Sequence, residues 1–229
     1  QFLEKRHFST QFLGYDHLHL GGKIIELFDS HGREVSTLAA PHEGYAIFDV
    51  TPFYAESGGQ VGDKGTIQGK TGEARVESTF KITKQILHKI KVEKGTLENQ
   101  KPYTLNVNPQ DRKLTAINHT ATHMLHAALR KILGERIKQA GSLVEPNRLR
   151  FDFTYPKALS PEELGRIENL VNSQIERHLP VSVKEMPYDD AIKSGALAFF
   201  DEKYGDKVRV VRVGTENDTF SVELCGGTH

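Results

Sequence analysis

Four residues in two distant segments carry side chains that bind transition metals. His119 and His123 lie four positions apart in Asn-His-Thr-Ala-Thr-His, and Cys225 and His229 lie four apart in Cys-Gly-Gly-Thr-His. Residues four apart on a helix share one face, so two imidazoles can reach a common ion. The two glycines between the second pair favour a tight turn that would bring both side chains onto the same ion. One thiolate with three imidazoles is a donor set typical of zinc.

The histidine pair alone also has a structural interpretation, because helix histidines are usually solvated or hydrogen-bonded and this chain contains 11 of them. An apolar stripe is predicted on the same helix at Leu114, Ile117, Ala121, Leu125, Ala128 and Ile132. We expect His119 and His123 to lie on the opposite face, outside the ordinary core. The only cysteine of the chain stands four residues before a histidine, which favours the metal interpretation.

Composition limits the class of protein. With 229 residues the chain can bury a sizeable core, and two domains are expected. A single cysteine excludes an internal disulfide, and no apolar run is long enough for a membrane span, so a cytoplasmic protein is expected, with a mitochondrial one as the open alternative. The net charge of zero argues against tight sequence-independent nucleic-acid binding. Between Arg130 and Arg150, basic residues outnumber acidic ones six to two, which fits either a local RNA-binding patch or a solvated face.

The order of predicted elements indicates an α+β protein. Residues 1–108 contain short β-type runs broken by glycine, which predict a β-barrel-like domain that includes a glycine-rich motif. These runs are at 23–27, 45–50, 65–68, 74–80, 85–91 and 103–107. Asn108 and Pro109 are typical of a helix start, and this helix is predicted to end at Leu133, before Gly134.

Residues 109–229 are expected to form a second, zinc-containing α/β domain. Ser160-Pro161-Glu162-Glu163 is a capping box that predicts another helix, ending at about His178. Strands are predicted at 149–153, 181–185, 208–213 and 219–224, so that the helices pack on an antiparallel sheet.

Six motifs occur in an order that resembles one family. They are Phe-Leu-Gly-Tyr-Asp at 12–16, Glu-Ser-Gly-Gly-Gln-Val-Gly-Asp at 56–63, His-Thr-Ala-Thr-His at 119–123, Gln-Ala-Gly-Ser-Leu-Val at 139–144, Leu-Arg-Phe-Asp-Phe at 149–153 and Glu-Leu-Cys-Gly-Gly-Thr-His at 223–229. The chain resembles the editing region of alanyl-tRNA synthetases and the related free-standing AlaX deacylases. The resemblance covers nearly the whole chain.

The resemblance implies an aminoacyl-tRNA deacylase that hydrolyses serine or glycine esters of tRNA(Ala). It implies Zn²⁺ as the cofactor, held by the four ligands named above, and the acceptor end of tRNA(Ala) as the partner. It places Thr122 and Gln139 in the pocket and Thr51 where it would contact a serine hydroxyl. The zinc would either lower the pKa of a water or hold the substrate while another water attacks.

These pocket residues also have structural alternatives. The Thr122 hydroxyl would otherwise bond to a backbone carbonyl one turn earlier. Gln139 would be an ordinary loop amide, and a glutamine is not a general base in any case. Asp152 is expected either to support a ligand histidine through its second ring nitrogen or to pair with Arg150.

The chain departs from the family in two respects. It lacks the aminoacylation core, which carries the ATP and alanine sites, and the family continues beyond His229, so we expect a C-terminally truncated fragment. Four protein ligands would also fill a tetrahedral shell, which is typical of structural zinc. A structural-zinc tRNA-binding module without hydrolytic activity is therefore the alternative. A threonyl-tRNA synthetase editing domain fits the 139–144 and 149–153 motifs less well, and a metalloprotease would need a glutamate where Thr120 stands.

Overall fold

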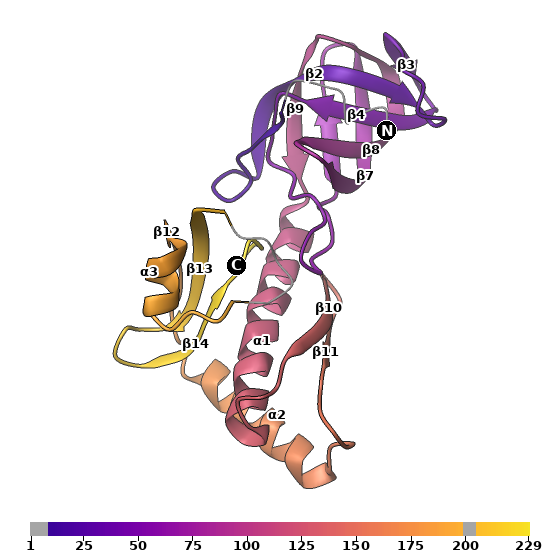
Figure 1. Ribbon diagram of the computed structural model, residues 1–229. Coiled ribbons are helices and arrows are strands. Elements are labelled where there is room, and N and C mark those ends of the chain that lie inside the picture. Colours follow the sequence, from indigo (N-terminus) through magenta and orange to yellow (C-terminus); the bar gives the residue numbers. More distant parts are fainter. Residues whose placement is uncertain (1–8, 199–204) are drawn as a thin grey trace. The chain divides into compact units, whose positions relative to one another are not determined.

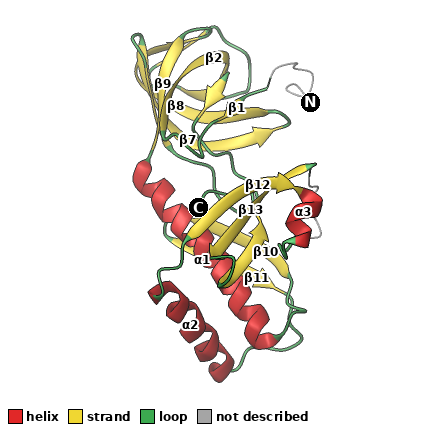
Figure 2. Cartoon of the chain, turned by 90° about the vertical axis from the view of Figure 1, so that its left-hand side faces the viewer, coloured by secondary structure: helices red, strands yellow, loops and turns green. Residues whose placement is uncertain are grey.

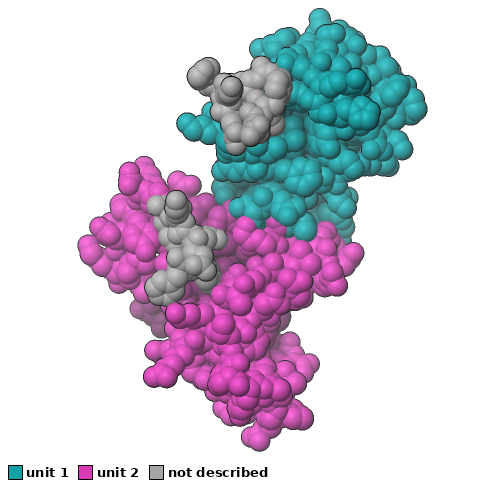
Figure 3. Space-filling model, turned by 45° about the vertical axis from the view of Figure 1, so that its right-hand side comes forward, with its two compact units in different colours: residues 1–57, 61–113 teal, residues 58–60, 114–229 magenta. Residues whose placement is uncertain are grey.

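The computed structural model describes residues 9–198 and 205–229. The chain divides into two compact units, shown in Figure 3. The first comprises residues 1–57 and 61–113, and the second comprises residues 58–60 and 114–229. The domain division between residues 108 and 109 stays a prediction.

The first unit contains a closed barrel of antiparallel strands, as predicted (Figure 1). The strands pair around the ring in the order β4, β2, β9, β6, β7 and β8, and β8 pairs with β4 to close it. Their bounds are β2 His19–Asp29, β4 Glu43–Phe48, β6 Gly65–Gln68, β7 Gly72–Ile82, β8 Gln85–Glu98 and β9 Pro102–Val107. Short strands are added outside this ring. β3 (Thr37–Ala39) pairs with β8, and β1 (Gln11–Phe12) pairs in parallel with β5 (Val50–Thr51).

Alternation of side chains fills the barrel, because successive strand residues point to opposite faces. On β9, Tyr103, Leu105 and Val107 are buried, whereas Thr104 between them is exposed. The same core includes Ile24, Leu27, Ala46, Phe48, Phe53, Ile67, Ala74, Val76, Ile90, Val92 and Leu97. The barrel is thus a packed core and not a pore.

A buried ion pair anchors the start of helix α1 (Pro109–Leu133) in the first unit. The guanidinium of Arg112 pairs with the carboxylate of Asp63 and also donates to the carbonyl oxygens of Gly14 and Pro52. The backbone N–H of Tyr54 donates to the same carboxylate at 2.7 Å. Two of the six sequence motifs, at 12–16 and 56–63, therefore meet on one arginine.

Both helices that the sequence predicts are confirmed. Asn108 caps α1, because its side-chain oxygen accepts from the backbone N–H groups of Gln110 at 3.0 Å and Asp111 at 3.2 Å. Gly134, which follows the helix, has a φ of 109° that suits glycine. α2 (Pro161–Glu176) begins with the predicted capping box and ends two residues before His178.

The strands of the second unit form two separate sheets, which corrects the prediction of a shared one. β10 (Gln139–Glu145) and β11 (Arg148–Phe153) form a hairpin. β12 (Val181–Pro187), β13 (Lys207–Gly214) and β14 (Thr219–Leu224) form an antiparallel sheet, against which the short helix α3 (Tyr188–Lys193) packs. A two-residue turn joins β10 directly to β11, so β11 takes its nearest neighbour in sequence as its partner.

Helix α1 lies between the hairpin and the three-stranded sheet (Figures 1 and 2). Its buried apolar residues share one core with α2, β11, β13 and β14, including Met124, Ala127, Ala128, Leu129, Phe151, Ile167, Val213 and Phe220. The predicted apolar stripe is partly wrong: Ile117 is 53% exposed, whereas His119 and His123 are buried. The buried face of α1 is rotated towards its histidines because β14 and the loop after it present polar partners there. No helix in the described ranges is long and apolar enough to cross a membrane.

Candidate metal centre

Four side chains converge in the second unit on a volume that can hold a metal ion. His119, His123, Cys225 and His229 each offer one donor atom, and all four donor atoms lie within 4.8 Å of one another. The Cys225 Sγ lies 3.3 Å from Nε2 of His119 and 3.4 Å from Nε2 of His229. The structure therefore brings together the two segments that the sequence analysis paired.

Each histidine ring of the cluster is held from behind by its other nitrogen. Nδ1 of His119 lies 2.8 Å from Oε1 of Gln60, and Nδ1 of His229 lies 3.1 Å from Oγ1 of Thr120. Nδ1 of His123 bonds to the carboxylate of Glu223.

These anchors leave the Nε2 atoms to face the thiol. Nε2 of His123 is buried and has no hydrogen-bond partner among the described residues. Such an atom costs free energy unless something binds it. The donor chemistry and this unpaired nitrogen both fit a metal ion.

A glycine makes room for the His119 ring. A Cβ placed on Gly227 would lie 2.1 Å from Cε1 and 2.3 Å from Nδ1 of His119. The loop that carries Gly227 is fixed by Arg209, whose Nη1 donates to the Gly227 carbonyl at 2.7 Å. The backbone N–H of Gly227 also points to the Cys225 Sγ at 3.3 Å. The glycine at 227 is thus needed for the close approach of this loop to the His119 ring, whereas the predicted tight turn between Cys225 and His229 stays a prediction.

Charge at the centre favours a thiolate even without an ion. Burial raises the pKa of the Cys225 thiol, but hydrogen bonds from His119 and His229 and the nearby imidazole of His123 outweigh it and hold that pKa well below its usual value of 9.0. Burial lowers the pKa of His229 to about 4. Burial also acts to lower the pKa of His123, yet the Glu223 carboxylate outweighs it and raises that pKa to about 10. A metal ion must therefore displace a proton from His123.

The predicted pocket residues of the second unit make local bonds. The Thr122 hydroxyl donates to the carbonyl oxygen of Asn118 at 2.8 Å, one turn earlier on α1. Nε2 of Gln139 donates to Oγ of Ser142 at 3.3 Å. The Thr122 bond is the structural alternative that the sequence analysis left open for this residue. The Gln139 bond is also a structural one, although Gln139 lies on a strand and not in a loop. Their part in a reaction stays a prediction.

Asp152 pairs with Arg150, the second of its two alternatives. Nε of Arg150 donates to the Asp152 carboxylate at 3.1 Å, and the two side chains are 61% and 45% exposed. Thr51 belongs to the first unit, where it is fully buried. Its Oγ1 lies 2.8 Å from Nε2 of His88 and accepts from the backbone N–H of Phe53 at 3.2 Å.

Comparisons with known proteins agree with the motifs. Residues 1–111 match the family model described as tRNA synthetases class II (A). The alanine-tRNA ligase of Nitratidesulfovibrio vulgaris is 49% identical over 221 residues, which is 96% of this chain and 25% of that protein. The enzyme of Carboxydothermus hydrogenoformans is 50% identical over 222 residues, or 96% of this chain and 25% of that protein. The enzyme of Thermotoga maritima is 46% identical over 234 residues, or 100% and 26%. The chain belongs to the alanine-tRNA ligase family.

The chain spans about a quarter of the length of the alanine-tRNA ligases that it matches. The family that the six motifs predicted is thus confirmed. The names of these relatives describe whole enzymes.

The sequence analysis assigned no role to four residues behind the cluster, namely Gln60, Thr120, Glu223 and His126. Gln60 and Glu223 stand inside quoted motifs of the alanine-tRNA ligase family, yet neither was assigned a role. His126 follows His123 by three positions and so shares its face of α1. A signal for Glu223 was available, because a residue two positions before Cys225 on a strand points to the same side as Cys225.

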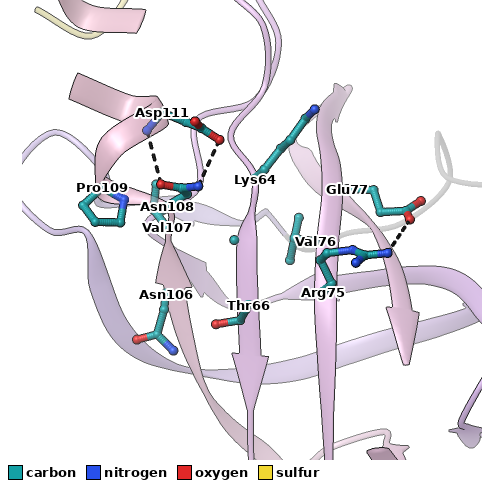
Figure 4. A pocket seen from close by; sticks show the side chains of 11 residues that line it. Lys64, Thr66, Arg75, Val76, Glu77, Asn106, Val107, Asn108, Pro109 and Asp111 are labelled. Atoms are coloured by element: carbon teal, nitrogen blue, oxygen red, sulfur yellow. Dashed lines mark hydrogen bonds and ion pairs between the residues drawn. The ribbon is translucent and has the colours of Figure 1, made fainter. Parts of the chain in front are cut away.

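A hollow of about 720 Å³ on the barrel is a weaker candidate site in this member of the alanine-tRNA ligase family (Figure 4). Arg75 in its wall pairs with Glu77 at 3.5 Å, and Nδ2 of Asn108 donates to Asp111 at 3.0 Å. Its charges are mixed and partly paired, so it offers no convergent set of groups for one ligand.

Proposed function

We propose that this chain is the editing region of an alanine-tRNA ligase and hydrolyses the ester that joins serine or glycine to tRNA(Ala). The observation that carries the proposal is the convergence of three imidazoles and one thiolate on a single centre. Family membership supplies the context. A pocket built for alanine cannot strongly reject glycine or serine, because one is only slightly smaller and the other only adds a hydroxyl, so a second, hydrolytic site is needed for accuracy.

Zinc is the metal that we propose for the centre. One thiolate and three imidazoles suit zinc, which accepts both nitrogen and sulfur donors in tetrahedral geometry. When bound, zinc supplies a positive charge that polarises the ester or acidifies water. Exchange of an ion for the proton on His123 also predicts that zinc affinity falls as the pH is lowered.

The side chains around the centre have distinct proposed tasks. Gln60, Thr120 and Glu223 fix the rings of the three histidine ligands, so that the ligand nitrogens do not have to be reorganised when substrate arrives. Thr122 donates its hydroxyl proton to a carbonyl, so towards substrate its oxygen acts as an acceptor. Gln139 donates to Ser142 through Nε2.

Thr122 and Gln139 therefore position substrate in this proposal and do not take its proton, because neither side chain is a general base at neutral pH. The proposed contact of Thr51 with substrate is less direct. Its hydroxyl already contacts His88, so a contact with a serine hydroxyl requires that the Thr51 oxygen share or exchange this bond. The proposed partner is the acceptor end of tRNA(Ala), which carries the ester.

One observation favours a second candidate function. The four donor atoms lie within 4.8 Å of one another, and four protein ligands complete a tetrahedral shell. A complete shell is typical of zinc that holds a fold together. The second candidate is accordingly a tRNA-binding module in which zinc is structural.

The deciding experiment measures ester hydrolysis and zinc content on the same samples. The zinc-loaded chain is incubated with seryl-, glycyl- and alanyl-tRNA(Ala), in parallel with a His123→Ala variant and a blank without protein. A His178→Asn variant serves as the matched control, because His178 is exposed, belongs to the same unit, and has a φ of 50° that asparagine tolerates.

Loss of the seryl or glycyl ester, with survival of the alanyl ester, is the expected result for the parent and for His178→Asn. His123→Ala should hydrolyse none of the three. If the parent binds one zinc ion per chain and all three esters survive at the blank rate, the structural candidate replaces the editing proposal.

A further inference from the structure

One buried carboxylate bridges two histidines of the same helix. Glu223 on β14 is 1% exposed, and each of its oxygens bonds to a different ring. Oε2 accepts from Nδ1 of His123, and Oε1 lies 2.7 Å from Nδ1 of His126. His126 is not one of the four clustered ligands. The arrangement is therefore a row of three groups with the metal centre at only one end.

We propose that Glu223, held in place by His126, is a positioning residue that sets the affinity of the centre for its metal. The inference rests on the metal centre of the proposed function, and it adds two residues to the four ligands. Glu223 does this by fixing one ring nitrogen of His123 as the proton carrier, so that the other presents its lone pair to the ion.

The protons in this row can be assigned from the bonds. A metal-bound His123 must carry its single N–H on Nδ1, because Nε2 faces the centre. That N–H needs an acceptor, and among the described residues the Glu223 carboxylate is the acceptor that it meets. An ionised carboxylate only accepts, so the Nδ1 of His126 must also be a donor to it.

Burial explains why the third member is needed. A carboxylate that is 1% exposed is costly unless charged or polar donors surround it. With His126 bonded to one oxygen, the carboxylate is held in the orientation in which its other oxygen meets His123. Without that donor, Glu223 gains freedom to rotate and ceases to fix the His123 ring.

The backbone around Glu223 makes the position rigid. Glu223 pairs with Val211 of β13 and forms a bridge with Leu197 on its other side. The His126 ring in turn packs 5.3 Å from the Phe151 ring, measured between centroids. Both ends of the Glu223–His126 bond are thus fixed by structure outside the centre.

The test uses metal affinity and one spectroscopic signature, neither of which depends on hydrolysis. Zinc dissociation constants are measured by chelator competition for the parent and for Glu223→Gln, His126→Leu and His126→Gln. Glutamine at 126 retains an N–H donor, whereas leucine fills similar space without one. Glu168→Gln, at an exposed glutamate on α2, is the matched control. Circular dichroism shows whether each variant is folded.

Glu223→Gln and His126→Leu should bind zinc about 10- to 100-fold more weakly, the usual effect of removing a group that orients a metal ligand. His126→Gln should recover most of this loss, and Glu168→Gln should match the parent. Equal affinity in folded His126→Leu and His126→Gln would overturn the role of His126, and an unchanged affinity in folded Glu223→Gln would overturn that of Glu223.

A measurement on the unmutated protein covers the case in which a variant does not fold. Long-range proton–nitrogen NMR of the zinc-loaded chain should show the His123 proton on Nδ1. A proton on Nε2, or none on Nδ1, overturns the inference directly. Failure of the parent to bind any zinc is a different result, because it removes the proposed metal centre itself.

Discussion

The Nδ1 atom of His119 lies 2.8 Å from the Oε1 atom of Gln60, although 59 positions separate the two residues in the chain. The same oxygen accepts from the backbone N–H of Thr228 at 3.0 Å, and Nε2 of Gln60 donates to the Thr228 hydroxyl at 3.0 Å. One fully buried amide thus joins the helix that carries two ligands to the loop that carries the other two.

Replacing Gln60 by methionine, which has a similar shape but no amide, should therefore loosen both ligand pairs. We expect the free energy of unfolding to fall by about 1–3 kcal/mol, the cost of leaving buried polar groups unpaired. Zinc affinity should fall as well. Urea titrations with and without chelator measure both effects. Gln110→Met, at an exposed position in the first turn of α1, is the control, and an equal loss in both variants would contradict the prediction.

Two adjacent glycines allow a matched steric test of the ligand loop. In Gly227→Ala the new Cβ would lie 2.1 Å from the His119 ring, so the ring or the loop has to move. In Gly226→Ala nothing lies within 4 Å of the new Cβ. We expect Gly227→Ala to bind zinc at least about 10-fold more weakly and Gly226→Ala to resemble the parent. Chelator competition measures the zinc affinities of the two variants. Similar affinities would contradict the prediction, because they would show that the loop moves to accommodate the added methyl group.

The barrel should lose stability in mild acid through His88. Burial lowers the pKa of His88 from 6.5 to about 4. Between these values the unfolded chain binds a proton that the folded chain does not. The stability that the neutral His88 side chain contributes to the fold is therefore intact above pH 6.5. It is lost progressively as the pH falls and is fully lost near pH 4. The loss amounts to about 3 kcal/mol.

Urea unfolding at several pH values checks this prediction. His88→Gln removes the titrating group, so its stability should depend less steeply on pH between 6.5 and 4 than that of the parent. His42→Gln, at an exposed histidine of the same unit, should keep the parent slope. Parallel curves for the parent and His88→Gln would show that other groups cause the acid loss.

The Asp63–Arg112 pair should be the costliest ion pair of the first unit to break. Both side chains are less than a tenth exposed, and Arg112 also satisfies two carbonyl oxygens. Arg112→Met should lower the free energy of unfolding by about 3–5 kcal/mol, because it leaves Asp63 buried without its cation. Arg75→Met breaks pairs of a half-exposed arginine and should cost at most about 1 kcal/mol. Denaturant titrations compare the two, and equal costs would contradict the argument.

Local signals in the sequence predicted the local structure well. The Asn108 cap and the Ser160 capping box fix their helix starts by bonds between residues two or three positions apart, and such bonds can be read from spacing. The barrel strands alternate buried and exposed residues, which is equally visible in the chain.

Features decided by distant partners were not predictable in the same way. Ile117 is exposed although it is apolar, because the polar rings of His119 and His123 occupy the buried face of α1. β10 was missed because Gly141 and Ser142 are poor strand formers and the register shifts between Gln139 and Gly141. For Ile117 the missing information was a contact across the fold, whereas for β10 it was a local irregularity of the strand.

In the candidate centre, too, some residues could be predicted from local sequence signals and others could not. Spacing and residue type together grouped the four clustered residues, since each pair lies four positions apart and one thiolate with three imidazoles suits zinc. The groups behind them could not be assigned from spacing, because Gln60 and Glu223 reach the histidines from other elements. A buried glutamate also runs against the ordinary expectation that acidic side chains are exposed.

The separation of the two ligand pairs has a consequence for biosynthesis. His119 and Cys225 stand 106 positions apart. At typical translation rates the second pair leaves the ribosome on the order of 10 s after the first. During that interval a nascent chain offers only the two imidazoles of the first pair, which bind an ion more weakly than the complete set of four donors. For the proposed zinc centre, metal capture is therefore a late step in maturation, and a chain that holds the ion has already closed the second unit around it.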